Sequence, residues 1–218
     1  MDTLQFKNGD AVLQKICSAD ERMARLVQAV GEYELELGTD YFPALVRSII
    51  GQQLSVVVAH KIWERTQNLC AEVTPEVVVR LADEQLKSAG LSGTKARYIK
   101  DLSQKVLSGE LDLARIDALP DAEIIRQLLQ VKGIGVWTAE MFLIFSLGRL
   151  DVLSLGDLGL KRSIQWLYGL KKPPADRTMK SLAKKWAPYR TVASLYLWEV
   201  INRRLIKESP EVLEKGEV

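Results

Sequence analysis

Apolar side chains recur along most of this chain with the spacing of an α-helix rather than that of a β-strand. In the clearest case they fall at i, i+3, i+4, i+7 and i+8 of one helix face: Phe42, Leu45, Val46, Ile49 and Ile50. A helix that starts at Thr74 and Pro75 has a capping hydroxyl and a proline in its first turn. The same periodicity predicts further helices at residues 56–69, 83–90, 94–107, 121–129, 136–145, 158–168, 178–185 and 191–206.

Strand signals are nearly absent from the sequence. The turn at residues 8–10, Asn-Gly-Asp, has no convincing alternating segment on either side that could pair. Glycine and proline end several of the expected helices, and no repeat of fixed period is visible. The pattern therefore predicts an all-α protein.

Composition narrows the class of protein only slightly. The 218 residues suffice for one large domain or two small ones. Lys and Arg total 30 against 28 Asp and Glu, so the net charge neither requires nor excludes a nucleic-acid partner. Two cysteines and one histidine are too few for a metal site made of side chains. With no signal peptide and no apolar run of about 20 residues, we expect a cytoplasmic protein without a membrane partner.

The most informative segment is the tight turn Val131-Lys132-Gly133-Ile134-Gly135, which lies between two expected helices. Glycine permits positive φ and close approach of another backbone. The second helix begins at once, so its free N–H groups and its dipole suit a phosphate, and Lys132 adds a positive charge. A plain helix–turn–helix corner with a glycine cap is the alternative interpretation.

Four segments in order resemble one protein family. Residues 131–139, Val-Lys-Gly-Ile-Gly-Val-Trp-Thr-Ala, resemble the helix-hairpin-helix of the base-excision DNA glycosylase superfamily. Residues 155–162 resemble the segment that carries the family's catalytic aspartate, and residues 47–55 resemble the segment that enters the DNA. Residues 186–198 resemble the closing helix of the alkylation-repair branch, the 3-methyladenine DNA glycosylase II type.

The resemblance implies two helical subdomains that flank a cleft. We expect residues 1–40 and 158–207 to form the terminal subdomain and residues 41–157 to form the central one, with the hairpin at 128–139. Residues 208–218 are charged and are expected to be a loose tail. The four-cysteine iron–sulfur loop of the endonuclease III branch is absent from the sequence, since no cysteine follows Cys70.

Asp157 is the predicted catalytic residue. Cleavage of an N-glycosidic bond leaves an oxocarbenium-like sugar, which a carboxylate stabilises while it orients or deprotonates the attacking water. Asp157 opens an expected helix, whose N-terminus favours the ionised form. The alternative is that Asp157 only caps the helix, which contributes about 1 kcal/mol. Asp151 is the nearest rival carboxylate, but its flanking residues do not match the family segment.

The resemblance also implies the type of reaction and the base pocket. The bifunctional branch has a nucleophilic lysine at the position of Trp137, so a tryptophan there implies a monofunctional hydrolase without a lyase step. Trp137, Trp198 and Met141 match pocket positions, where aromatic faces attract electron-poor alkylated purines. The alternative is that both tryptophans are core residues.

The remaining expectations concern DNA contacts. A target base must be flipped out of the duplex, and Gln52 or Gln53 is expected to fill the gap, with Gln53 at the family's wedge position. The hairpin residues expected to contact DNA are Lys132, Gly133, Gly135 and Thr138. The resemblance implies a monovalent cation, Na⁺ or K⁺, on the main-chain carbonyls of Leu129, Val131 and Ile134, and no other cofactor. The basic residues of segment 86–97 are expected to form a solvated face, and contact with the DNA backbone is the alternative.

Taken together, these features predict a monomeric, monofunctional glycosylase that releases alkylated purines from double-stranded DNA. One alternative is a non-catalytic helix-hairpin-helix protein that binds damaged or abasic DNA, in which Asp157 is only a helix cap. Another is an all-α protein–protein adaptor, in which the basic hairpin is incidental.

Overall fold

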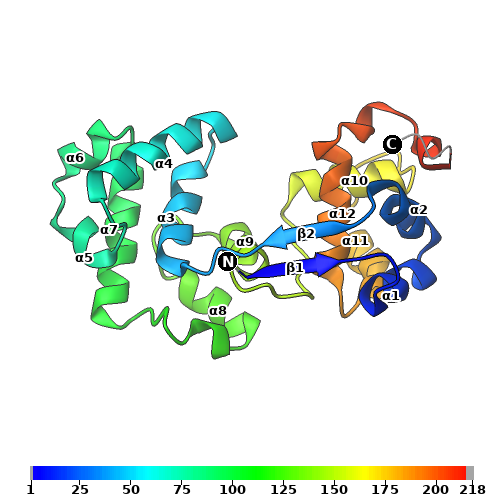
Figure 1. Ribbon diagram of the computed structural model, residues 1–218, viewed down its shortest axis with the longest axis horizontal. Coiled ribbons are helices and arrows are strands. Elements are labelled where there is room, and N and C mark those ends of the chain that lie inside the picture. The colour runs from blue at the N-terminus through cyan, green and yellow to red at the C-terminus, as the bar shows by residue number, and fades with distance from the viewer. Residues whose placement is uncertain (1, 215–218) are drawn as a thin grey trace. The chain divides into compact units, whose positions relative to one another are not determined.

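The computed structural model describes residues 2–214 and is mostly helical, as predicted (Figure 1). The chain divides into two units. The hairpin unit runs from Gly38 to Leu147, and the terminal unit combines the residues up to Leu37 with those from Gly148 on. Among the described residues, none of the helices is both long enough and apolar enough to cross a bilayer.

The hairpin unit is built around α3 (Tyr41–Gly51), which packs on three other helices: α4 (Val56–Cys70), α7 (Gly93–Ser108) and α9 (Val136–Phe145). The apolar residues predicted for one face of α3 are all buried. The hydroxyl of Thr74 accepts the Val77 N–H at 3.4 Å, which confirms the predicted start of the next helix. The other elements of this unit are α5 (Pro75–Arg80), α6 (Asp83–Ser88), the short 3-10 helix η1 (Ile116–Ala118) and α8 (Asp121–Leu128).

The terminal unit joins the two ends of the chain around α12 (Arg190–Asn202). Residues 191–197 of α12 are buried on every side, and the helix packs against α2 (Glu21–Val30) and α10 (Leu158–Leu167). Figure 1 shows the blue N-terminal helices beside the yellow to red C-terminal ones. The other helices of this unit are α1 (Ala11–Ala19), α11 (Asp176–Ala183), η2 (Lys184–Trp186), η3 (Leu205–Lys207) and η4 (Pro210–Glu214).

Two short strands were not predicted. β1 (Thr3–Phe6) pairs antiparallel with β2 (Tyr33–Glu36), with Leu4 opposite Leu35. The local turn after β1 leads into α1, so the partner strand comes only after two helices. Each strand has four residues, which is too short for a recognisable alternation.

The boundary between the units differs from our expectation. Residues 148–157 belong to the terminal unit, because hydrogen bonds join them to the start of α12. The Thr191 N–H donates to the Leu150 carbonyl at 2.9 Å, and the Val152 N–H donates to the Thr191 hydroxyl at 2.9 Å. The N-terminal part of the terminal unit ends at Leu37, just after β2, whereas we expected it to end at residue 40.

The C-terminal end also differs. The last long helix stops at Asn202 rather than 206, because Arg204 adopts a left-handed conformation with φ +62°. The tail expected from residue 208 is tied down in its first part, where the Trp166 indole donates to the Glu208 carbonyl at 2.7 Å and Leu213 is buried. Residues 215–218 of that tail lie outside the described residues.

Candidate active site

Asp157 caps the N-terminus of α10, and its side chain is held from two directions. Its Oδ1 accepts the backbone N–H of Leu160 at 2.6 Å and the indole N–H of Trp198 at 3.0 Å. The second bond crosses from α12, the best-buried helix of the terminal unit. A rigid helix and a half-buried indole therefore fix where this half-buried carboxylate lies.

The absence of a side chain at Gly159 leaves space for the Asp157–Trp198 pair. A Cβ at position 159 would lie 3.2 Å from Asp157 Oδ1 and 3.7 Å from Trp198 Cδ1. The neighbouring Gly156 has nothing within 4 Å of a Cβ. The two glycines of this segment therefore differ in role, since only Gly159 is packed against the predicted catalytic side chain.

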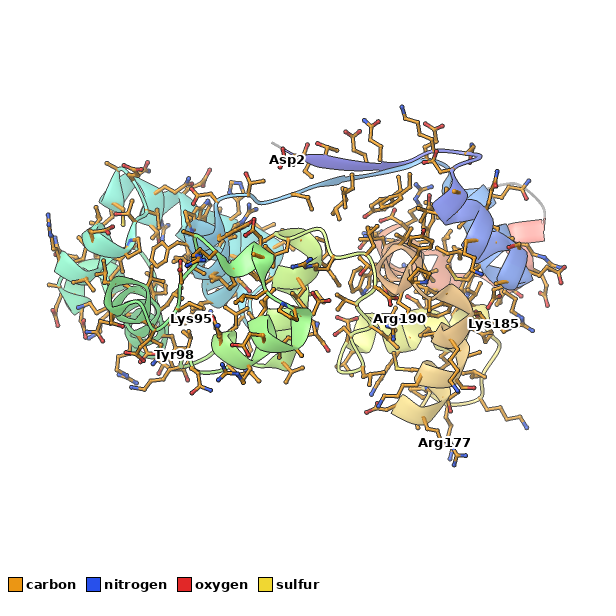
Figure 2. All side chains as sticks on the ribbon, turned by 90° about the horizontal axis from the view of Figure 1, so that it is seen from below. Asp2, Lys95, Tyr98, Arg177, Lys185 and Arg190 are labelled. Atoms are coloured by element: carbon orange, nitrogen blue, oxygen red, sulfur yellow. The ribbon has the colours of Figure 1, made fainter. Side chains whose placement is uncertain are left out.

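Asp151, the rival carboxylate, is committed to another partner. Arg190 donates three hydrogen bonds to its carboxylate, two from the guanidinium at 2.7 Å and one from the backbone N–H at 3.2 Å. These hydrogen bonds hold the pKa of Asp151 below its usual range. Figure 2 labels Arg190 in the terminal unit. Asp151 therefore anchors the loop before α10 to α12, and Asp157 remains the candidate for catalysis.

Gly133 is required in the hairpin for an internal reason. It has φ +82°, and a Cβ would lie 2.0 Å from Cδ2 of the Tyr98 ring, so any side chain would collide with α7. Gly135 is different, since its φ is −100° and nothing lies within 4 Å of a Cβ. The space in front of Gly135, at the N-terminus of α9, is open to an approaching phosphate.

The other predicted hairpin contacts divide into exposed and buried groups. The side chain of Lys132 is 74% exposed, and its Nζ lies 3.4 Å from Asp101 Oδ1. Its backbone N–H donates to Asp101 Oδ2 at 2.9 Å and is therefore not offered to a phosphate. Thr138 is only 4% exposed, so its hydroxyl does not lie on the surface where we expected a DNA contact.

The two glutamines after α3 are not equivalent. Gln52 donates its side-chain amide to the Gly133 carbonyl at 2.8 Å, which ties this segment to the hairpin. Gln53 is exposed and has φ +57°, and Leu54 beside it is 39% exposed. The structure therefore commits Gln52 to an internal bond, and Gln53 remains the predicted wedge.

Trp137 and Met141 lie one turn apart on α9, in the hairpin unit, and Trp137 is 45% exposed. With the exposed Phe145 they form an apolar stripe on the side of the helix opposite the buried residues Ala139 and Leu143. Trp198 belongs to the terminal unit, where its indole is bonded to Asp157. The interpretation of Trp137 as a core residue is therefore not supported, because almost half of its surface is exposed.

The three carbonyls predicted to hold a cation belong to the turn of the hairpin. Leu129 follows the last residue of α8, where carbonyls lack intrahelical donors. The Val131 carbonyl accepts the Ile134 N–H at 3.1 Å, and its second lone pair can still coordinate an ion. These residues fit a monovalent cation, which stays a prediction.

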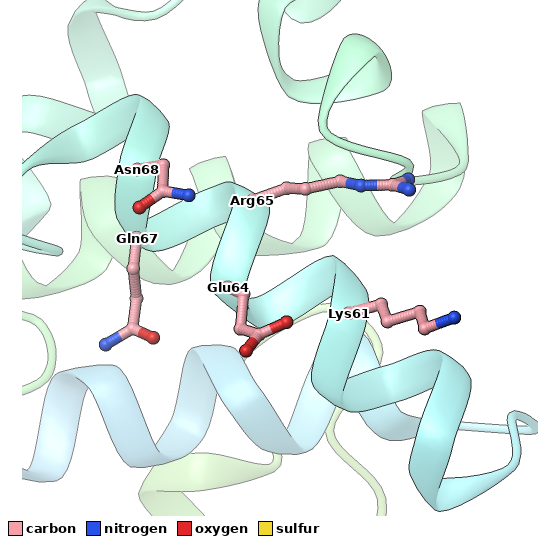
Figure 3. Close-up of a pocket in the computed structure, with 5 residues that line it drawn as sticks. All are labelled: Lys61, Glu64, Arg65, Gln67 and Asn68. Carbon is pink, nitrogen blue, oxygen red and sulfur yellow. The ribbon is translucent and has the colours of Figure 1, made fainter.

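Two surface hollows have linings that do not include Asp157, Trp137 or Trp198. The first is on α4 and is lined by Lys61, Glu64, Arg65, Gln67 and Asn68 (Figure 3). The second is in the terminal unit and is lined by Leu153, Leu155, Lys180, Ala183, Lys184, Ala187 and Arg190. Neither contains an aromatic side chain, so neither offers the stacking face that an electron-poor purine needs.

The family can be decided by comparison with known proteins. The model of the HhH-GPD superfamily of base excision DNA repair proteins matches residues 46–188. The chain belongs to this superfamily. The match includes the hairpin and Asp157, but not Trp198.

Individual relatives agree with this assignment. A solved DNA-3-methyladenine glycosidase from Bacillus halodurans is 39% identical, with a TM-score of 0.86 over 95% of this chain and 96% of its own. DNA-3-methyladenine glycosylase 1 of Schizosaccharomyces pombe is 33% identical over 83% of this chain and 82% of its own. A putative DNA-3-methyladenine glycosylase of Bacillus subtilis is 33% identical over 77% of this chain, which spans only 61% of that relative.

Several residues that shape the site were not predicted from the sequence. Gly159 appeared only within a motif, and Tyr98 and Asp101 carried no local signal. Lys95 was expected on a solvated face, but its Nζ bonds to the carbonyls of Ile50 and Gln52. A spacing of three residues places Lys95, Tyr98 and Asp101 on one side of α7, and that spacing was the only available hint.

Proposed function

We propose that this protein is a monofunctional DNA glycosylase that hydrolyses the N-glycosidic bond of alkylated purines in double-stranded DNA. The observation that carries the proposal is the carboxylate of Asp157, held at the start of α10 by Leu160 and Trp198, in a member of this superfamily. The names of the three relatives described above, each a 3-methyladenine glycosylase or glycosidase, support the substrate class. One chain supplies every proposed part, so the proposal requires no second copy.

The chemistry proposed for Asp157 is electrostatic. The bond between C1′ of the sugar and the base nitrogen breaks, and its electron pair leaves with the base. Asp157 stabilises the positive charge that develops on the sugar and accepts a proton from the water that adds to C1′. The two hydrogen bonds on Oδ1 hold the carboxylate in one orientation before the reaction begins.

The hydrolytic outcome follows from the residue at position 137. A lyase reaction needs an amine that attacks C1′ and forms an imine, and an indole cannot do so. The lysine of the hairpin, Lys132, does not supply this amine in the proposal, because it lies on the phosphate side with its Nζ beside Asp101. Water is therefore the proposed nucleophile.

Substrate binding is proposed to use the exposed elements of the hairpin unit. Gly135 and the first turn of α9 would receive a DNA phosphate, with Lys132 beside it and a monovalent cation on the carbonyls of Leu129, Val131 and Ile134. Trp137 would stack on the flipped base, and the thioether of Met141 would pack at its edge. Gln53 would fill the gap left in the duplex.

The decisive experiment is release of methylated bases from alkylated double-stranded DNA by the wild type and by Asp157→Asn. Asparagine still caps a helix, so Asp157→Asn should fold with a nearly unchanged unfolding midpoint while excision falls by a hundredfold or more. Asp176→Asn, an exposed carboxylate at the start of α11, is the matched control and should retain full activity.

Three results would contradict the proposal or part of it. Equal excision by the wild type and Asp157→Asn would remove the carboxylate from the mechanism. A wild type that releases no base but binds an abasic duplex in a salt-sensitive way would support the non-catalytic alternative. Trapping of a covalent enzyme–DNA adduct by borohydride would refute the monofunctional reaction.

A further inference from the structure

One side of α7 touches two segments that are far from it in the sequence, and all three lie in the hairpin unit. Lys95 lies next to the segment that follows α3, whereas Tyr98 and Asp101 lie next to the hairpin. The three side chains are spaced by three residues, so they form one side of the helix (Figure 2 labels Lys95 and Tyr98).

Lys95 closes the C-terminal end of α3. Its ammonium donates to the carbonyls of Ile50 and Gln52 at 2.7 and 2.8 Å. The last carbonyls of a helix lack intrahelical donors and carry its partial negative charge, so a cation there is favourable. Partial burial lowers the pKa of Lys95, because desolvation disfavours the charged ammonium.

The segment held by Lys95 includes a strained residue. Gln53 has φ +57°, a backbone conformation that residues other than glycine rarely adopt. Such a backbone persists only where the surroundings hold it in place. Here the residue before it is held twice, through its carbonyl by Lys95 and through its side-chain amide by Gly133.

The hairpin is held by the same helix. The ring of Tyr98 fills the space beside Gly133, and Asp101 accepts the Lys132 N–H at 2.9 Å. The hydrogen bond from the Gln52 side chain to the Gly133 carbonyl joins the two segments directly. Both segments therefore rest on α7 and on each other.

We propose that Lys95, Tyr98 and Asp101 form a positioning platform that sets the wedge segment at Gln52 and Gln53 in register with the phosphate-binding hairpin. This inference rests on the proposed function. Lys95 touches neither the base nor the sugar in this scheme, and it acts through the backbone of Gln52. Its contribution is thus confined to extrusion of the base from a duplex, a step that single-stranded DNA does not require.

The test compares excision from single-stranded and double-stranded methylated oligonucleotides of the same sequence, by the wild type and Lys95→Met. Methionine keeps the length of the side chain and removes its donors. We expect Lys95→Met to lower single-turnover excision from the duplex at least tenfold and from the single strand less than twofold. Lys100→Met is the matched control, because Lys100 lies on the same helix and its ammonium pairs with Asp83 of α6 rather than with a platform residue.

A second readout follows base extrusion directly. A 2-aminopurine placed beside an abasic analogue in a duplex brightens when the protein unstacks it, and Lys95→Met at saturating concentration should lose most of that increase. Gln52→Leu, which removes the other restraint, should show the same selective loss. The double variant should be no worse than the poorer single variant, because both bonds hold one segment.

The outcomes separate this inference from the proposed function. Equal losses on single strand and duplex, or no loss on the duplex, would overturn the platform. A wild type that releases no base from either substrate would instead overturn the proposed function, and the 2-aminopurine signal would still decide the platform. If Lys95→Met does not fold, as judged by its thermal unfolding, Gln52→Leu carries the same comparison.

Discussion

The substitution Gly159→Ala separates catalysis from stability at the predicted active site. Gly159 is the second residue of α10, and alanine inside a helix is ordinarily more stable than glycine by up to about 1 kcal/mol. The new methyl group would lie 3.2 Å from Asp157 Oδ1 and 3.7 Å from Trp198 Cδ1. The carboxylate must therefore move by a few tenths of an ångström from the position in which both donors now hold it.

The expected effect on the rate follows from that displacement. A misplacement of about 1 Å of a reacting group costs roughly a hundredfold, so a shift of a few tenths of an ångström should cost about three- to tenfold. That range corresponds to about 0.7–1.4 kcal/mol of transition-state stabilisation. The unfolding midpoint should stay the same or rise.

The assay is single-turnover release of 7-methylguanine from methylated duplex DNA, together with thermal unfolding of each variant. Gly156→Ala is the matched control, because Gly156 lies in the same segment and a Cβ added there would have nothing within 4 Å. Its excision rate should equal that of the wild type. A Gly159→Ala enzyme with an unchanged rate, or a Gly156→Ala enzyme that is equally slow, would refute the link between Gly159 and the carboxylate.

Three further predictions concern neighbouring residues. Trp198→Phe keeps the aromatic ring but removes the N–H that reaches Asp157, so excision should fall about tenfold while the affinity for an abasic duplex stays within twofold. Gly133→Ala should lower the unfolding midpoint because of its φ of +82° and the Tyr98 ring, whereas Gly135→Ala should unfold like the wild type and only weaken DNA binding. Asp151→Asn should unfold earlier at pH 7. Because Arg190 lowers the pKa of Asp151 in the folded protein, its contribution is present above the unfolded value of 3.8, and the difference between wild type and variant should shrink as pH falls below it.

Most of the helices could be predicted because helix formation is a local property. The period of apolar residues and the capping hydroxyl of Thr74 placed α3 and α5 correctly. Errors occurred where the deciding partner was distant. The β1–β2 pair joins segments separated by two helices, and the loop before α10 joined the terminal unit through Thr191.

The sequence by itself determined the chemical identities at the candidate site: a carboxylate at a helix start, a Gly-Ile-Gly turn before another helix, and tryptophan rather than lysine at position 137. Only the tertiary structure decided which groups hold them. The bonds from Trp198 to Asp157 and from Lys95 to Ile50 join residues 41 and 45 positions apart, a separation at which no helical or strand period operates. Packing of α12 and of α7 brings these groups within hydrogen-bond distance, and for that reason the indole of Trp198, which was predicted to stack on a base, also donates to the carboxylate.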